Sequence, residues 1–95
     1  MKVRVLKKTD NEIEFELEGE GHTFCNILRR TLLEDPLVEY AAYRLDHPLV
    51  GLPRFYVRTK GKDPLDALID ATEKIQKSTE EFIEKFKKAV REYRK

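Results

Sequence analysis

The first part of the chain alternates apolar and charged residues, which is typical of β-strands with one solvent-exposed face. The runs VRVL and NEIEFELE, residues 3–6 and 11–18, flank a polar turn at residues 9–11. Glutamates separate the apolar residues of the second run, which are Ile13, Phe15 and Leu17. This period of two predicts an antiparallel hairpin with one face in the core.

Helical spacing replaces the alternation after the glycines at positions 19 and 21. Apolar or small residues then recur in steps of three and four, at Phe24, Ile27, Leu28, Thr31 and Leu32. This spacing predicts an amphipathic helix over residues 23–34, with His22 or Thr23 as its cap. Asp35-Pro36 ends the helix, because a residue before proline disfavours the helical conformation.

Two further strands follow, at residues 37–45 and 54–60, separated by a loop at 46–53 that contains two prolines and a glycine. The first strand has apolar residues on both faces, with Val38, Tyr40 and Ala42 on one face and Leu37, Ala41, Tyr43 and Leu45 on the other. This predicts a central strand. The second strand has Phe55 and Val57 inward and Tyr56 and Arg58 outward.

The last third of the chain has the pattern of one long helix. Asp63 suits the cap and Pro64 the first helical position, and neither Gly nor Pro occurs over 65–95. Thirty helical residues would span about 45 Å, whereas a domain of this size has a radius of gyration of roughly 12 to 13 Å. We therefore expect the helix to project beyond its own sheet, because bending it back requires a breaker that the sequence lacks.

The projecting half of this helix carries large apolar residues, which are Phe82, Ile83, Phe86, Val90 and Tyr93. Leaving them in water forfeits roughly 1.5 to 3 kcal/mol each, so we expect something other than the chain's own sheet to cover them. The predicted fold is α+β, with an antiparallel sheet of about four strands and two main helices on one face. Residues 1–95 form a single domain, and the family resemblance given below implies that the long C-terminal helix forms a dimer interface.

Composition and charge limit the classes of function. The chain is 39% charged but carries a net charge of only +1, so its bulk charge does not favour binding to nucleic acid. One cysteine cannot form an internal disulfide, and no apolar run resembles a signal peptide or a membrane span. These features predict a cytoplasmic protein. The wealth of Glu, Lys and Arg predicts a thermophilic source, because ion-pair networks gain value at high temperature.

The segment GEGHTFCNILRRTLLEDP, residues 19–36, contains most of the candidate chemistry. His22 and Cys25 lack a third ligand and an orienting acid, so we interpret His22 as a helix-entry residue and Cys25 as a small core residue. Gly19-Glu20-Gly21 lacks the rest of a phosphate-binding motif. No catalytic site, metal site or cofactor site is predicted.

The same segment and the strand after it resemble the small assembly subunit of multisubunit RNA polymerases. The resemblance is closest to the archaeal subunit L type, and extends to the eleventh subunit of eukaryotic polymerase II and the amino-terminal domain of the bacterial alpha subunit. The motif residues are His22, Thr23, Asn26, Asp35, Pro36, Val38, Tyr40, Tyr43, His47 and Pro48. Cys25 and Phe24 depart from the small and aliphatic residues usual in the family.

The resemblance implies a chain without catalytic residues that pairs with the larger alpha-like subunit, which in archaea is the D type. The heterodimer would serve as a platform on which the two large catalytic subunits assemble, and no direct contact with nucleic acid or membrane is expected. The expected partner contacts come from both helices and are Phe24, Ile27, Leu28, Arg29, Arg30, Thr31, Leu32, Ile75, Thr79, Phe82, Ile83, Phe86 and Val90.

The sequence is compatible with other classes of function. A stand-alone protein-interaction domain would use the same apolar helix faces. A nucleic-acid-binding domain would use the small basic cluster around the last strand, formed by Arg54, Arg58, Lys60 and Lys62. A small metal or redox enzyme would require His22 and Cys25 to share a site.

Overall fold

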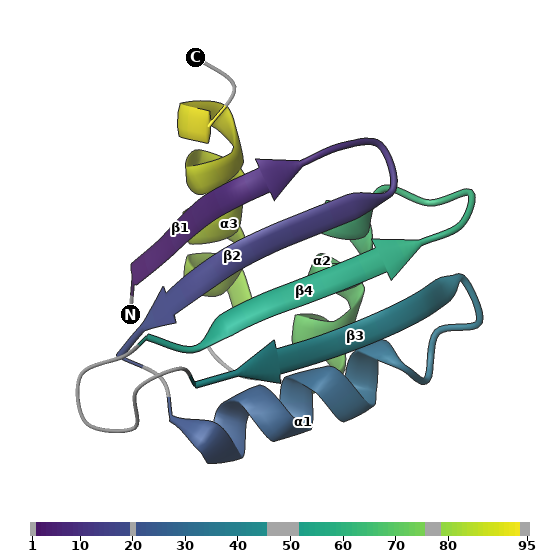
Figure 1. The fold of residues 1–95 in the computed structure, drawn as a ribbon, viewed down its shortest axis with the longest axis horizontal. Helices are drawn as coiled ribbons and strands as arrows, with labels where there is room; N and C mark the ends of the chain where they lie inside the picture. The colour runs from purple at the N-terminus through teal and green to yellow at the C-terminus, as the bar shows by residue number, and fades with distance from the viewer. Residues whose placement is uncertain (1, 20, 46–51, 76–78, 94–95) are drawn as a thin grey trace.

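The computed structural model describes residues 2–19, 21–45, 52–75 and 79–93. In chain order the elements are β1 (Lys2–Lys8), β2 (Glu12–Glu18), α1 (His22–Leu32), β3 (Val38–Arg44), β4 (Arg54–Thr59), α2 (Pro64–Ile75) and α3 (Thr79–Tyr93). The strands form one antiparallel sheet in the order β1-β2-β4-β3, with the helices behind one face (Figure 1). The predicted α+β fold with a four-stranded antiparallel sheet is confirmed.

The two middle strands, β2 and β4, hold the centre of the core. Phe15 of β2 is opposite Phe55 of β4, and their rings stack with centroids 5.3 Å apart. Both side chains are fully buried, as are the flanking inward residues Ile13, Leu17 and Val57. The alternation read from the sequence therefore assigns the faces of these strands correctly, because one face packs on helices and the other meets solvent.

The prediction that β3 is a central strand is wrong, because in the sheet of described residues β3 lies at an edge and pairs only with β4. Its pairing is irregular between Val38 and Tyr40. The two residues were expected on one face, but Val38 is buried whereas Tyr40 is 49% exposed. A bulge of this kind shifts the alternation by one residue. The other apolar side chains of β3 lie beside α1 on one face of the sheet and beside Tyr56 on the other face.

Helix α1 begins one residue earlier than predicted and ends at Leu32. Its N-cap is Gly21, which makes no side-chain cap hydrogen bond, so neither His22 nor Thr23 acts as the cap. The helix forms because Phe24, Leu28 and Leu32 share a face that is buried against the sheet and α2. Cys25 is fully buried on the same side, as expected of a small core residue.

The expected projecting helix is not observed. The molecule's longest dimension is 37 Å, which is shorter than the ~45 Å of a straight thirty-residue helix. Helices α2 and α3 instead run separately behind the sheet, with α3 packed on β1 (Figure 1). Phe86 of α3 is only 1% exposed and meets the edge of Phe15 at 4.9 Å between centroids. The burial of this apolar face stabilises α3 on the sheet. The two helices therefore run separately although the sequence has no Gly or Pro between them. Residues 76–78, which connect them, lie outside the described part.

Candidate subunit interface

The outward face of α1 is uncovered and partly apolar. Ile27 is 42% exposed, and Leu33 at the C-cap is exposed as well. Thr31 lies between them on the helix, half-buried, and its hydroxyl donates to the carbonyl oxygen of Ile27 at 2.8 Å. This hydrogen bond occupies the polar group of Thr31 within the helix. The exposed apolar residues of this face are therefore Ile27 and Leu33, with the exposed Arg30 beside them.

A groove of about 530 Å³ separates α1 from α2. Its apolar floor is formed by Leu32 of α1 and by Ala67 and Ala71 of α2, whose small side chains keep the groove open. The rim is charged, with Lys74 3.9 Å from Glu34 across the two helices. A groove with an apolar floor and a charged rim can accept the apolar side chains of a partner helix.

One lysine ties the end of α1 to α2 below this groove. Lys62 Nζ donates to Asp35 Oδ2 at 2.7 Å and to Asp70 Oδ2 at 2.5 Å. The hydrogen bond from Lys62, together with that from the Leu37 amide, holds the pKa of Asp35 below its usual value. The two carboxylates raise the pKa of Lys62. The charges fix the loop after α1 against α2 and so hold the two walls of the groove together.

A second polar contact positions the start of α1 beside β3. The hydroxyl of Tyr43 lies 2.7 Å from His22 Nδ1, and the Tyr43 ring stacks on Phe55 at 5.8 Å between centroids. His22 is therefore anchored to the sheet through a core aromatic residue. The contact joins two of the predicted motif residues, which are 21 residues apart in the sequence.

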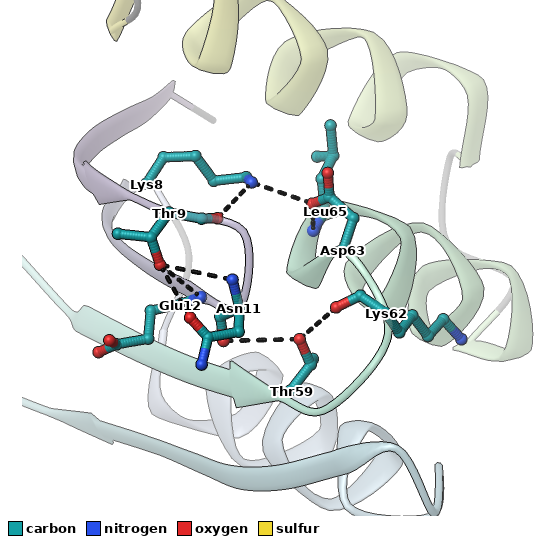
Figure 2. Close-up of polar contacts among 8 residues, drawn as sticks. All are labelled: Lys8, Thr9, Asn11, Glu12, Thr59, Lys62, Asp63 and Leu65. Carbon is teal, nitrogen blue, oxygen red and sulfur yellow. Dashed lines mark hydrogen bonds and ion pairs between the residues drawn. The ribbon is translucent and has the colours of Figure 1, made fainter.

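A network that the sequence did not suggest joins the β1–β2 turn to the start of α2. Lys8 Nζ lies 3.1 Å from Asp63 Oδ1 and donates to the carbonyl oxygen of Thr9 at 2.7 Å (Figure 2). Its side chain is only 2% exposed. Asp63 Oδ1 also accepts from the Leu65 amide at 2.8 Å, so the predicted role of Asp63 at the helix start is confirmed. Nothing in the pattern near Lys8 signals a buried lysine.

The structure divides the predicted partner contacts into two sets. The side chains of the first set are buried in the chain's own core, and they are Phe24, Leu28, Leu32, Phe86 and Val90. The expectation that the C-terminal helix would be uncovered is therefore wrong for Phe86 and Val90. In this conformation no side chain of the first set projects from the surface toward a partner, although Leu32 lines the floor of the α1–α2 groove. The physical reason is that the sheet buries them as effectively as another polypeptide would.

Side chains of the second set remain accessible. Ile27 and Arg30 of α1 are exposed. The partly buried ones are Arg29 and Thr31 of α1, Ile75 of α2 and Ile83 of α3. Arg29 donates to Asn26 Oδ1 at 3.0 Å, which turns it along α1 toward β3. Thr79 and Phe82 lie in α3, but their side chains fall outside the described part of the structure.

The motif residues lie around the two ends of α1. His22, Asn26 and Tyr43 line one groove, and Asp35 and Pro36 line the other; Thr23 is exposed, and Val38 and Tyr40 belong to β3. His47 and Pro48 lie outside the described residues. The motif residues that the structure describes therefore lie on α1, on β3 and in the turn between them.

The alternative sites do not assemble. Cys25 is buried in the core whereas His22 is exposed, so they do not share an accessible site. Among residues with described placement, no group of three or more His, Cys, Asp or Glu could hold a metal ion. Within the same ranges, no helix has the length and apolar content needed to cross a membrane.

Acidic partners neutralise much of the predicted basic cluster. Arg54 Nε lies 3.8 Å from Glu14, Arg58 Nε lies 4.0 Å from Glu39, and Lys62 binds Asp35 and Asp70. Arg58 also lies over the Tyr40 ring, 5.9 Å from its centroid. A row of glutamates on β2 borders the same face, which makes it a poor surface for a phosphate backbone.

Known proteins resemble this chain over nearly its whole length. Residues 12–85 match the sequence model of the RNA polymerase Rpb3/Rpb11 dimerisation domain. The DNA-directed RNA polymerase subunit Rpo11 of Pyrococcus furiosus is 46% identical over 94 residues, covering 96% of this chain and 99% of the relative. The subunit Rpo11 of Methanothrix thermoacetophila is 44% identical over 91 residues, covering 96% and 100%.

The fold has a solved counterpart. The crystal structure of DNA-directed RNA polymerase subunit L from Thermoplasma acidophilum superposes with a TM-score of 0.72 at 31% identity, covering 98% of this chain and 92% of that one. The matched length includes all four strands and the three helices described above.

Proposed function

Because the chain belongs to the RNA polymerase Rpb3/Rpb11 dimerisation-domain family, we propose that it is a non-catalytic subunit of a DNA-directed RNA polymerase of the archaeal L type. It pairs with the D-type alpha-like subunit, and the heterodimer is the platform on which the large catalytic subunits assemble. The observation that carries the proposal is the family match, whose range contains all of α1 and α2 and the groove between them.

The proposed surface for the alpha-like subunit is the outward side of α1 and the groove between α1 and α2. Ile27 and Leu33 supply exposed apolar contact, and the groove floor at Leu32, Ala67 and Ala71 accepts apolar side chains of a helix. Ile75 of α2 and Ile83 of α3, which are partly buried, complete the proposed apolar contacts. The exposed Arg30 supplies a charge on α1 beside these contacts, where it steers orientation more than it adds affinity.

The chain contributes assembly rather than chemistry in this proposal. Nucleotidyl transfer is assigned to the large subunits, and no cofactor or direct nucleic-acid contact is assigned to this chain. The pairing of Arg54, Arg58 and Lys62 with acids supports this assignment. We expect the chain to act in the cytoplasm.

Co-purification tests the proposed surface. Ile27→Asp places a charge in the proposed apolar contact and should reduce the amount of chain recovered with the tagged alpha-like subunit by about tenfold or more, as truncated hot spots do. Leu52→Asp is the matched control, because Leu52 is 41% exposed on the opposite end of the sheet from the groove. Equal recovery of both variants would remove Ile27 from the interface, and failure of the unaltered chain to bind the alpha-like subunit would overturn the proposed function.

A further inference from the structure

The turn between β4 and α2 begins with a buried threonine whose hydroxyl reaches beyond its own strand. Thr59 is the last residue of β4 and is fully buried. Its hydroxyl donates a hydrogen bond to the carbonyl oxygen of Lys62, three residues further along the chain (Figure 2). This bond joins the backbone of Lys62 to the end of β4.

Thr59 is itself held between two neighbouring segments. Its amide donates to the carbonyl oxygen of Asn11 at 2.8 Å, which continues the pairing of β4 with β2 beyond Glu12. On the other side, Val38 of β3 lies opposite Thr59 in the sheet. The hydroxyl of Thr59 therefore starts from a fixed point between two strands.

A glycine brings Lys62 back within reach of Thr59. Gly61 has a φ of +71°, in the left-handed region that residues with a Cβ disfavour. Apart from its chain neighbours, no atom of the described residues lies within 4 Å of the point where a Cβ would be. The glycine is therefore needed for the conformation of the turn and not for space, and that conformation returns the Lys62 carbonyl to the Thr59 hydroxyl.

The side chain of Lys62 joins the two walls of the α1–α2 groove. Its Nζ lies 2.7 Å from Asp35 Oδ2, in the turn after α1, and 2.5 Å from Asp70 Oδ2, on α2. Both acids line the groove. The side chains of Lys62 and Asp35 are only 20% and 18% exposed, so solvent screens this pair less than an ordinary surface pair.

The carboxylate of Asp35 has little freedom to follow a displaced lysine. Its Oδ1 accepts from the Leu37 amide at 2.9 Å, while its Oδ2 binds Lys62. A shift of the Lys62 backbone would therefore lengthen the bond to Asp35 or the bond to Asp70. The place at which the backbone of Lys62 is held thus decides whether its side chain spans both walls of the groove.

We propose that Thr59 is a positioning residue for partner binding at the α1–α2 groove. The Thr59 hydroxyl holds the backbone of Lys62, and the Lys62 side chain then spans Asp35 and Asp70 and sets the opening of the groove. Thr59 is buried in the core and acts through Lys62. The inference rests on the proposed function in one respect, which is that the groove receives the alpha-like subunit.

A second buried threonine supplies a matched control. Thr72 is 2% exposed, and its hydroxyl donates to the carbonyl oxygen of Ile69 at 2.9 Å within α2. Removing either hydroxyl deletes one buried hydrogen bond of a threonine, but only that of Thr59 reaches Lys62. A difference between Thr59→Val and Thr72→Val therefore separates the positioning of Lys62 from a general loss of stability.

The first test is an NMR titration of the carboxyl groups in the isolated full chain. The hydrogen bond from Lys62 is the largest cause that holds the pKa of Asp35 below its ordinary value of 3.8, and the charge of Lys74 adds a smaller effect. Thr59→Val should let Lys62 move away and raise the pKa of Asp35 toward that ordinary value. Thr72→Val should keep this pKa low, and so should Thr59→Ser, because serine retains the hydroxyl.

The second test measures the dissociation constant for the alpha-like subunit by titration calorimetry. Thr59→Val should weaken binding about fivefold or more, within the range of coupling between residues of one hydrogen-bond network. Thr72→Val and Thr59→Ser should leave the dissociation constant unchanged. Lys62→Met should weaken binding by at least as much as Thr59→Val, and combining the two should cause no further loss, because Thr59 acts through Lys62.

Gly61→Ala is a second variant for the case in which Thr59→Val does not fold. The exposed alanine leaves the core intact, but its Cβ strains the left-handed turn and draws the Lys62 carbonyl away from Thr59. This variant should raise the pKa of Asp35 in the same direction as Thr59→Val.

Three results would overturn the proposal. They are an unchanged pKa of Asp35 in Thr59→Val, or in Gly61→Ala if the valine variant does not fold; equal affinities of Thr59→Val and Thr72→Val for the alpha-like subunit; and additive losses for Thr59→Val and Lys62→Met. Failure of the unaltered chain to bind the alpha-like subunit would instead remove the proposed function. The titration of Asp35 would still decide whether Thr59 positions Lys62.

Discussion

The ring of Phe86 in α3 meets the ring of Phe15 in β2 edge-on, with centroids 4.9 Å apart and planes at 87°. Phe15 in turn stacks on Phe55, so three aromatic residues from two strands and one helix form the centre of the core. Aromatic pairs in these geometries contribute beyond the area that they bury. The last helix is thus an internal part of the fold.

Removing the Phe86 ring should therefore destabilise the isolated chain. We expect Phe86→Ala to lower the free energy of unfolding by about 3 to 5 kcal/mol, as large-to-small changes of buried aromatic residues do. Tyr93→Ala, on the same helix at an exposed position, should change it by less than about 0.5 kcal/mol. Chemical denaturation measures both values. A loss below about 1 kcal/mol for Phe86→Ala would mean that α3 leaves the sheet in solution.

The buried lysine makes a second prediction. Lys8→Met removes the donor to Asp63 and to the Thr9 carbonyl while keeping the length of the side chain, and should cost about 1.5 to 3 kcal/mol of stability. Lys7→Met is its control, because Lys7 is half exposed and only loosely paired with Glu12; surface pairs contribute about 0 to 1 kcal/mol. Thermal unfolding measures both variants, and equal losses of stability for Lys8→Met and Lys7→Met would show that the contacts of Lys8 add no stability.

Acid should weaken the contact between Asp35 and Lys62. The pKa of Asp35 is below its ordinary value of 3.8, so its contribution is present above that value and is lost as pH falls through the lower folded value. We expect Asp35→Asn to flatten the acid side of the curve of unfolding free energy against pH. Glu34→Gln, an exposed neighbour on the same loop, should leave the curve unchanged. An unaltered acid side for Asp35→Asn would contradict the assigned pairing.

The same contact has an alkaline counterpart. The pKa of Lys62 is raised above its ordinary value of 10.5 by Asp35 and Asp70, so its contribution is present below that value and is lost as pH rises through the higher folded one. Lys62→Met should reduce this alkaline dependence in equilibrium unfolding. A curve that keeps its full alkaline fall in Lys62→Met would assign the loss to another group.

The charged surface predicts heat resistance. Ion pairs bridge β1 to β2, β2 to β4 and β3 to β4, as in Arg4–Glu16, Arg54–Glu14 and Arg58–Glu39. Networks of this kind gain value as temperature rises. We expect a melting temperature above about 65 °C by calorimetry, beyond the range of most mesophilic domains. A lower value would contradict the thermophilic interpretation of the composition.

The sequence predicted those parts of the fold that depend on neighbouring residues. Alternation assigned the inward face of β2 because Ile13, Phe15 and Leu17 meet one continuous core. Alternation failed to place β3, which has apolar residues on both faces but is an edge strand. One of these faces lies beside α1, and the other carries neighbouring aromatic rings. Periodicity also cannot distinguish a helix face that packs on its own sheet from one that packs on a partner. For that reason Phe86 was predicted to contact a partner, whereas it lies in the core.

The candidate site was predictable to a similar degree. The motif around α1 identified the family, and helical spacing identified Ile27 and its neighbours as one face. The contacts that hold the site in place join distant segments, as in Lys62 with Asp35 and Tyr43 with His22. No local pattern signals such pairs, because each residue is an ordinary surface type on its own.

Native mass spectrometry of this chain mixed with the alpha-like subunit of its own polymerase tests the central claim most directly. We expect a complex of one copy of each chain, and further addition of the large subunits to it but not to this chain alone. The account would be contradicted if this chain formed no complex with the alpha-like subunit, or if it joined the large subunits equally well in the absence of that partner.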